Sequence, residues 1–358
     1  MTPHGQLPDP ASDRDELKRL TVEVLGHEGS YGILVGLVME LVEILDRSAG
    51  FRADPGGEVV EGGIRSGGGL AISPAQAALC ADEPTRTAVF LRGVHDAISK
   101  AIATPRETQQ AVQVLYAGSG PYATLGIPLM TLFPPEQVRF TILDLHPVSI
   151  QSVKAIVGRL GLGKSVASCV VADACRYVIP EGEIPAVIVS ETMDAALGNE
   201  PQVAIMRHLL SQAPGARLVP ESVQVDAFLL DTSREPERIE PDREDSIPAS
   251  SPDRLPLGRV FTLDAPTIGK WTTLTGDRLP AATIEMPAAP GPHYEPYLFT
   301  TIVTHGNHIL RTHDCGLTSP RAFPGEGKWA TGDRIQFHYR LGTDPGLGWS
   351  PAGAPAVS

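Results

Sequence analysis

Two glutamates, Glu191 and Glu200, are the residues best suited to chemistry. They lie nine positions apart in the segment SETMDAALGNE, which overlaps the end of the apolar run AVIVS, a pattern typical of a buried strand. One acid after a strand can serve as a helix cap, but two acids that converge there bind a cation. A guanidinium suits paired carboxylates best, because its planar fork of five donors engages both in fixed orientations. The alternative is a solvated acidic loop.

A second set of polar residues follows the earlier apolar runs. The run VQVLYA leads into a glycine turn, FTILD ends in Asp144, 26 residues after Gly118, and CVVAD ends in Asp173. In an open parallel sheet, ligands bind beyond the carboxyl ends of the strands, where a glycine turn admits the ligand and an acid accepts ribose hydroxyls. We therefore expect Asp144 at a ribose and Asp173 near an adenine edge, around Gly118, Ser119 and Gly120. Ordinary turns with capping acids are the alternative.

The surrounding elements predict three parts. Residues 1–110 carry helical periodicity, interrupted by the glycine-rich stretch 54–69, for which we expect a flexible loop. Residues 111–219 alternate strand-like and helical runs, which indicates a Rossmann-like α/β domain with a parallel sheet. Residues 220–358 have strand-like runs separated by proline and glycine, typical of an antiparallel β domain, with a charged, mobile excursion expected over 231–258.

Composition narrows the class of protein. The chain has 358 residues, of which 42% are hydrophobic, but no apolar run long enough to cross a bilayer. Its net charge of −13 disfavours nucleic acid and anionic membranes and favours cationic ligands. The four cysteines form no CxxC pair, and the N-terminus lacks a basic, apolar signal sequence. We expect a cytoplasmic protein.

Three other patterns suggest ligands that we disfavour. Residues 158–165, GRLGLGKS, match a phosphate loop, but they follow a helix and precede a strand, whereas a true phosphate loop has the opposite order. A dinucleotide site would continue after Gly120 with small residues towards a third glycine. Pro121 stands there instead, which disfavours binding of a pyrophosphate. A metal could be bound by His305, His308, His313 and Cys315. Packed histidines are the simpler explanation, and we expect no metal.

The segment SETMDAALGNE resembles the double-glutamate loop of protein arginine methyltransferases, with the serine, both glutamates, Met193 and Leu197 at matching places. The segment DEPTRT at 82–87 and the segment GARLVPESVQVDAFLLD at 215–231 also resemble the family, and the similarity covers about 75–231. The resemblance implies a class I methyltransferase domain followed by a β-barrel, and S-adenosyl-L-methionine as cofactor. It implies a cofactor site formed by Arg86 at the carboxylate, Gly118, Ser119, Gly120, Asp144, Asp173 and Ala174, and an acceptor site of Glu191, Met193, Glu200 and His305.

The sequence departs from the family in three places. Tyr116 stands where the first strand usually has an aspartate, an N-terminal Tyr-Phe helix is missing, and the Thr-His-Trp loop has only 304–306 or 312–314 as candidates. These parts help to shape a protein-substrate site. The resemblance therefore favours bacterial relatives that methylate the guanidino group of free L-arginine, as in streptozotocin-type natural-product biosynthesis. Methylation of peptide arginine, of another amine or hydroxyl, or cofactor binding without catalysis are the alternatives. Family members commonly form a homodimer.

Overall fold

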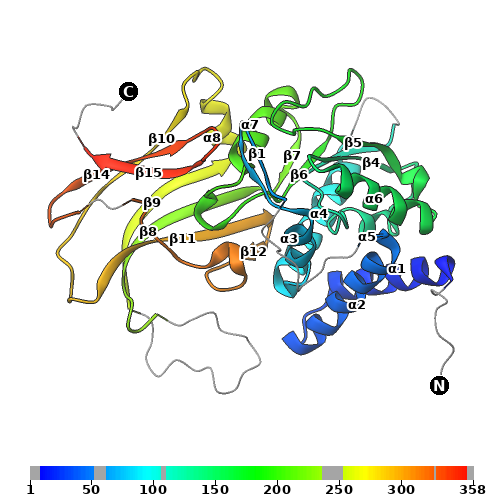
Figure 1. The fold of residues 1–358 in the computed structure, drawn as a ribbon, viewed down its shortest axis with the longest axis horizontal. Helices are drawn as coiled ribbons and strands as arrows, with labels where there is room; N and C mark the ends of the chain where they lie inside the picture. Colours follow the sequence, from blue (N-terminus) through cyan, green and yellow to red (C-terminus); the bar gives the residue numbers. More distant parts are fainter. Residues whose placement is uncertain (1–8, 52–61, 106–109, 236–252, 326–327, 353–358) are drawn as a thin grey trace.

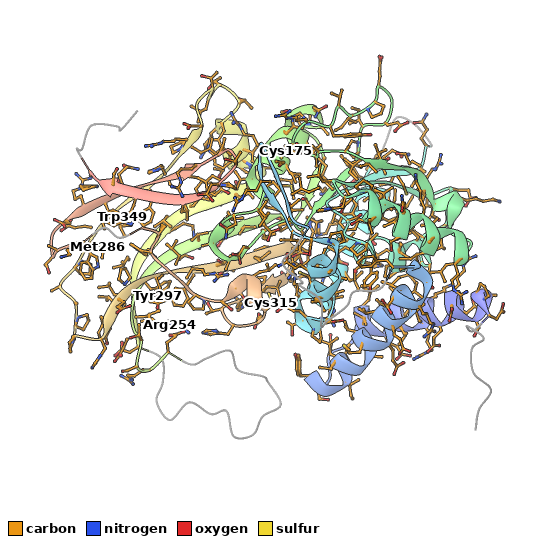
Figure 2. All side chains as sticks on the ribbon, viewed as in Figure 1. Cys175, Arg254, Met286, Tyr297, Cys315 and Trp349 are labelled. Atoms are coloured by element: carbon orange, nitrogen blue, oxygen red, sulfur yellow. The ribbon has the colours of Figure 1, made fainter. Side chains whose placement is uncertain are left out.

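The computed structural model describes residues 9–51, 62–105, 110–235, 253–325 and 328–352. It consists of two parts that lie side by side (Figure 1), a parallel sheet covered by helices and a region of antiparallel sheets. Figure 2 places Cys175 and Cys315 near the junction of these parts, and Met286, Tyr297 and Trp349 among the antiparallel strands. Within the described ranges, no helix has both the length and the apolar character that crossing a bilayer requires.

The parallel sheet confirms the predicted α/β architecture. Its strands are β3 (Val112–Ala117), β4 (Val138–Asp144), β5 (Val166–Val171), β6 (Val187–Ser190) and β7 (Arg217–Val219). They pair in the order β5-β4-β3-β6-β7, and every pair is parallel. The chain order therefore reverses at the boundary between β3 and β6. Such a switch point leaves a crevice beyond the carboxyl ends of the strands, which is where open α/β sheets bind ligands.

Helices cover the sheet and extend the N-terminal region. They are α1 (Pro10–Gly26), α2 (Tyr31–Ala49), α3 (Pro74–Cys80), α4 (Pro84–Ala103), α5 (Ile127–Met130), α6 (Pro147–Arg159) and α7 (Gln202–Gln212). A buried ionic cluster fixes the first two helices to the sheet domain, because Asp13 of α1 accepts hydrogen bonds of 2.7 Å from Arg47 of α2 and from Arg159 of α6. Burial opposes the charge of Asp13, but the two guanidinium groups outweigh it and lower the pKa of its carboxyl group.

A hairpin lies where we predicted a flexible loop. Residues 54–61 of that loop lie outside the described residues, but β1 (Ile64–Ser66) and β2 (Gly69–Ala71) pair as an antiparallel hairpin. The glycines serve close packing here rather than flexibility. A Cβ atom on Gly68 would lie 2.4 Å from Sγ of Cys175, and Gly69 has a φ of 141° and would clash with Asn199 O at 2.8 Å. The prediction of a loop over 64–69 was wrong.

The C-terminal part contains the predicted antiparallel strands. These are β8 (Ser222–Asp231), β9 (Arg254–Asp264), β10 (Arg278–Glu285), β11 (Tyr294–His305), β12 (His308–Leu310), β13 (Arg321–Ala322), β14 (Arg334–Arg340) and β15 (Gly346–Pro351), with helix α8 (Ala265–Lys270) after β9. One sheet has the order β12-β11-β8-β9, with β13 on β11, and another has the order β10-β14-β15. Stacked rings of Phe261, Trp271 and Tyr339 fill their interior. Most of the charged excursion predicted over 231–258, residues 236–252, lies outside the described residues.

Helix α4 connects the two parts of the fold. Its Gly93 packs directly against Thr304 at the end of β11, where a Cβ atom on Gly93 would lie 2.4 Å from the Thr304 hydroxyl oxygen. The same hydroxyl lies within hydrogen-bonding distance of the Val89 and His308 carbonyl oxygens, at 3.0 and 3.1 Å. Because Arg86 is in the first turn of α4, this contact also fixes the position of Arg86 relative to the antiparallel sheet.

Replacing Gly93 by alanine should destabilise the protein, because the added methyl group overpacks the contact with Thr304 at a typical cost of about 1–3 kcal/mol. Gly36, within α2, has no neighbouring atom within 4 Å of an added Cβ. Gly36→Ala should therefore stabilise the protein by up to about 1 kcal/mol through helix propensity alone. Denaturant unfolding of both variants measures the difference. Equal stabilisation by the two substitutions would contradict the close packing at Gly93.

Candidate functional site

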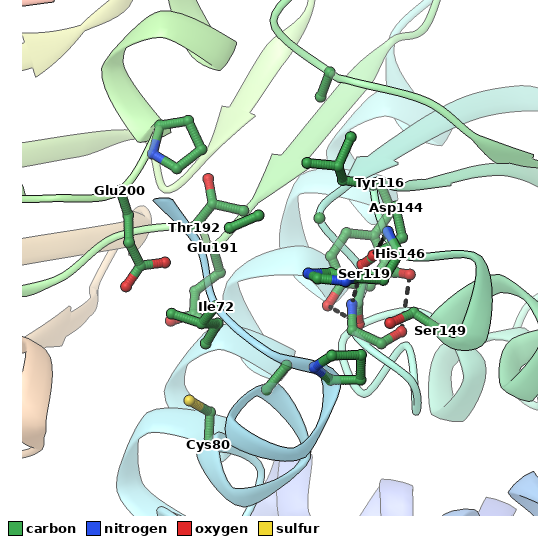
Figure 3. Close-up of a pocket in the computed structure, with 18 of the residues that line it drawn as sticks. Ile72, Cys80, Tyr116, Ser119, Asp144, His146, Ser149, Glu191, Thr192 and Glu200 are labelled. Carbon is green, nitrogen blue, oxygen red and sulfur yellow. Dashed lines mark hydrogen bonds between the residues drawn. The ribbon is translucent and has the colours of Figure 1, made fainter. Parts of the chain in front are cut away.

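A cavity of about 1010 Å³, partly open to solvent, lies beyond the carboxyl ends of β3, β4 and β6. Nine of the predicted site residues line it: Arg86, Gly118, Ser119, Gly120, Asp144, Asp173, Ala174, Glu191 and Glu200. Figure 3 shows Glu191 and Glu200 on one side of this cavity and Ser119, Asp144 and His146 on the other. The cavity therefore has an acidic side and a side formed by the strand-end turns.

The glycine turn after β3 is shaped by its neighbours. The amides of Gly118 and Ser119 both donate to the Leu143 carbonyl, at 2.9 and 3.2 Å, which closes the turn against the end of β4. Gly118 has a φ of 74°, and a Cβ atom there would lie 2.2 Å from Cγ2 of Thr192. Both the left-handed backbone and the close approach require glycine at this position.

Asp144 braces this turn from the end of β4. Its side chain is buried, and its two oxygens accept 2.8 Å hydrogen bonds from the amides of Gly120 and His146. Burial raises the pKa of the carboxyl group, while the two amide donors work against that rise. A carboxylate has about four lone-pair positions, so Asp144 can still accept hydrogen bonds from a ligand. Asp173 is less buried and accepts from the Cys175 amide at 2.9 Å.

Glu191 forms a buried ion pair with Arg86. The guanidinium donates to Glu191 through Nη2 and to Glu83 through Nη1, the latter at 3.1 Å, and the side chains of Arg86 and Glu191 are only 9% and 14% exposed. Arg86 is the one arginine among the described residues that line the cavity. Burial raises the pKa of Glu191, and Arg86 counteracts the rise. The residue predicted to bind a cofactor carboxylate thus contacts the residue predicted to bind a guanidinium.

Among the described residues, Glu200 has no basic partner as close as that of Glu191. Burial, followed by the negative charge of Glu191, raises the pKa of Glu200 to about 8, and Arg86 only partly offsets the rise. The two carboxyl groups are therefore close enough to repel each other, as paired acids at a cation site must be. At neutral pH Glu200 is mostly protonated, and a bound cation would favour its ionised form. Burial also raises the pKa of the neighbouring Cys80 thiol to about 11, so this cavity residue is a neutral group.

The loop that carries both glutamates has an unusual backbone. Ala196, Leu197 and Asn199 all have positive φ values, of 56°, 58° and 60°. Residues other than glycine adopt this conformation at a cost, so the surroundings must hold it. Three hydrogen bonds from the C-terminal part do so: Ala196 N–H to Thr300 Oγ1 at 2.8 Å, Tyr339 O–H to Leu197 O at 2.8 Å, and Asn199 N–H to Pro345 O at 2.9 Å.

Gln202 holds the two ends of this loop together, and the sequence analysis missed it. Its fully buried side chain donates to Ser190 O at 2.9 Å and accepts from Thr192 N–H at 2.9 Å, on the strand side of the loop. Its own amide donates to Thr192 O at 3.1 Å. A glutamine just after the loop gives no signal in the sequence, because its role depends on burial at the first turn of α7.

Two of the predicted acceptor-site residues do not line the cavity. Met193 is buried in the hydrophobic core, at 2% exposure. His305 is buried near the end of β11, with Nδ1 3.1 Å from Oε2 of Glu221. The geometry thus gives no support to a substrate contact by either residue. Tyr116, at the end of β3, lines the cavity and directs its hydroxyl to the Ser119 carbonyl at 3.4 Å.

The residues weighed and disfavoured as metal ligands lie in separate environments. His308 contacts Asp96 at 3.0 Å, His313 contacts Glu235 at 2.8 Å, and Cys315 lies against Thr318. The described residues contain no cluster of three or more His, Cys, Asp or Glu side chains that could hold a metal ion.

The segment 158–165, which matches a phosphate loop in sequence, follows a helix and precedes a strand, as predicted. Helix α6 ends at Arg159, Gly161 has a φ of 66°, and β5 begins at Val166. Only a short 3-10 helix, Gly163–Ser165, lies between them, so the segment has the helix-to-strand order that we predicted and not the strand-to-helix order of a phosphate loop.

Comparison with models of known protein families gives no match, and comparison with curated proteins gives none either.

The raised pKa of Glu200 predicts a pH-dependent stability difference. Between pH 4.5, its ordinary pKa, and about pH 8, the folded protein keeps a proton that the unfolded chain releases, so this group's contribution to stability is lost as pH rises. Glu200→Gln does not titrate. Its free energy of unfolding, relative to wild type, should increase across this window by up to about 1.4 kcal/mol per pH unit.

Denaturant unfolding at pH 5, 6.5 and 8 measures this difference. Glu136→Gln, at an exposed site, is the control and should show no such trend. A pH-independent difference for Glu200→Gln would mean that Glu200 is ionised normally in the folded protein.

Proposed function

We propose that the protein is an S-adenosyl-L-methionine-dependent N-methyltransferase that acts on the guanidino group of free L-arginine. The observation that carries the proposal is that Glu191 and Glu200 line the same cavity as the glycine turn and Asp144. The proposal includes a class I methyltransferase fold for the parallel sheet and a barrel-like arrangement of the C-terminal strands. The order of the parallel strands, with the chain reversal at β3 and β6, is consistent with it.

The residues around the cavity fit this cofactor chemically. Asp144 is suited to ribose hydroxyls, the Gly118–Gly120 turn allows a ligand to approach the backbone, and Asp173 with Ala174 borders the adenine side. Arg86 supplies a positive charge for an amino-acid carboxylate. When bound, S-adenosylmethionine supplies an electrophilic methyl group on a sulfonium. Its positive charge agrees with a cavity whose acids outnumber its one arginine.

The acidic side of the cavity is suited to a guanidinium acceptor. Glu191 already binds the guanidinium of Arg86, so its carboxylate is positioned to accept this type of fork. A protonated guanidinium has no free lone pair, and the site must therefore orient it and accept a proton as the new bond forms. Glu200 has a pKa of about 8, close to neutral pH, and can accept this proton once the bound cation has favoured its ionised form. In-line positioning of the acceptor nitrogen can lower the barrier by about 7–11 kcal/mol.

The hairpin favours a small acceptor over a polypeptide. Ser66 and Ala71, from its two strands, line the cavity together with Ile72 and Glu200. The hairpin is tied to the glutamate loop by the Leu70 N–H to Asn199 O hydrogen bond, at 2.8 Å. It is also tied to the C-terminal part by Arg65, which donates to the Thr343 carbonyl at 3.0 Å. The hairpin therefore covers the cavity next to Glu200, where the rest of an acceptor molecule must fit.

Replacing either glutamate by glutamine should abolish most turnover and leave cofactor binding intact. A positioned acid–base group typically contributes 10²- to 10⁴-fold, so we expect Glu191→Gln and Glu200→Gln to be at least about 100-fold slower. Mass spectrometry of L-arginine, a short arginine peptide and a panel of amines, each incubated with S-adenosylmethionine, detects the product.

Glu136→Gln should keep full activity in this assay. Methylation of the peptide alone would replace the substrate in the proposal. Binding of the cofactor without methylation of any acceptor would point to a non-catalytic protein, and wild-type rates in both glutamine variants would reject the assignment of the site.

Arg86→Lys tests the contact with the cofactor carboxylate, because it keeps the charge that pairs with Glu191 but loses the planar fork. We expect about tenfold weaker binding of S-adenosylhomocysteine, the loss of roughly one charge-assisted hydrogen bond. Binding of methylthioadenosine, which lacks the carboxylate, should be unchanged. Calorimetry measures both affinities, and equal weakening of the two ligands would show a structural role for Arg86 instead.

A further inference from the structure

His146 lies on the strand-end side of the cavity, beside Asp144. It is the residue before α6, and its amide donates to Asp144 at 2.8 Å. Its side chain is 8% exposed and makes no hydrogen bond to cap the helix. Serine, threonine, asparagine or aspartate is preferred at such a position for capping. Helix capping therefore does not explain a histidine here.

One ring nitrogen of His146 is unsatisfied in the part of the chain that the structure describes. Nε2 of His146 is buried and has no hydrogen-bond partner among the described residues. An unsatisfied polar atom in the interior is costly, and a native structure contains few of them. Because His146 also lines the cavity, a ligand in the cavity is the partner that can relieve this cost.

The position of His146 indicates which part of a ligand it would contact. Figure 3 shows it beside Asp144 and Ser119, across the cavity from Glu191 and Glu200. A neutral imidazole nitrogen can either donate or accept a hydrogen bond, which suits a hydroxyl group or a ring nitrogen. These groups belong to a nucleoside, whereas the guanidinium of an acceptor has only donors and belongs on the acidic side.

We propose that His146 is a nucleoside-binding residue, whose Nε2 exchanges a hydrogen bond with the ribose or the base of the cofactor. This inference rests on the proposed cofactor, but it does not require that the protein transfers a methyl group. It predicts that His146 increases the affinity for the ligand and lowers the stability of the unliganded protein.

Two substitutions separate hydrogen bonding from shape. His146→Leu keeps an apolar side chain of similar bulk, while His146→Gln places an amide nitrogen near the position of Nε2. We expect His146→Leu to bind both S-adenosylhomocysteine and adenosine about tenfold more weakly, and His146→Gln to recover most of the affinity. Without ligand, His146→Leu should melt at or above the temperature of wild type, because it removes a buried unpaired group. His305→Leu, at a buried histidine outside the cavity, should bind both ligands normally.

Calorimetry and thermal unfolding of these variants give distinct outcomes. Wild-type affinity in His146→Leu would overturn the inference while leaving the proposed function intact. Weaker binding together with a lower melting temperature in both His146 variants would show that the residue supports the fold only, and would also overturn it. Failure of wild type itself to bind S-adenosylhomocysteine would instead reject the proposed function.

Discussion

The candidate site depends on a loop whose backbone is unfavourable by itself. Between Glu191 and Glu200, three residues other than glycine are held in the left-handed region, at a cost that only fixed neighbours can offset. Those neighbours are a hydroxyl on β11, a tyrosine on β14 and the chain before β15. The antiparallel part of the molecule therefore contributes to the candidate site indirectly, by holding the loop that carries the acids. The parallel-sheet part carries both acids, but the hydrogen bonds that hold their loop come from the antiparallel part.

Charge balance is the second constraint on this cavity. Glu83, Glu191 and Glu200 lie around a single guanidinium, that of Arg86. Arg86 contacts two of these acids and so offsets the desolvation cost of their negative charge. Glu200 avoids most of this cost by retaining a proton. A second cation entering the cavity can replace that proton as the counter-charge. The unliganded protein can therefore keep Glu200 in the cavity in its protonated form. A cationic ligand would favour the ionised form.

Local patterns in the sequence were sufficient to predict which residues lie at the strand ends. Gly118, Asp144 and Glu191 each follow a short apolar run, and the carboxyl ends of parallel strands meet at one edge of the sheet, so their convergence could be predicted. Features that depend on residues distant in the sequence could not be predicted from local patterns. The ion pair of Arg86 with Glu191 joins positions 105 residues apart, and the roles of Gln202 and His146 follow from burial by other elements. The hairpin was missed because glycine indicates both flexibility and close packing.

The ionic cluster around Asp13 has a consequence for protein engineering. Arg47 and Arg159 direct their guanidinium groups inward to a carboxylate supplied by α1, a helix that lies far from the cavity in sequence and contributes none of its lining. Shortened versions that begin after this helix would lose the carboxylate that both arginines contact and would uncover the apolar surface that Leu17, Leu20 and Val24 cover, so trimming there exposes the protein to aggregation. An affinity tag or fusion partner is better attached ahead of α1 than in place of it.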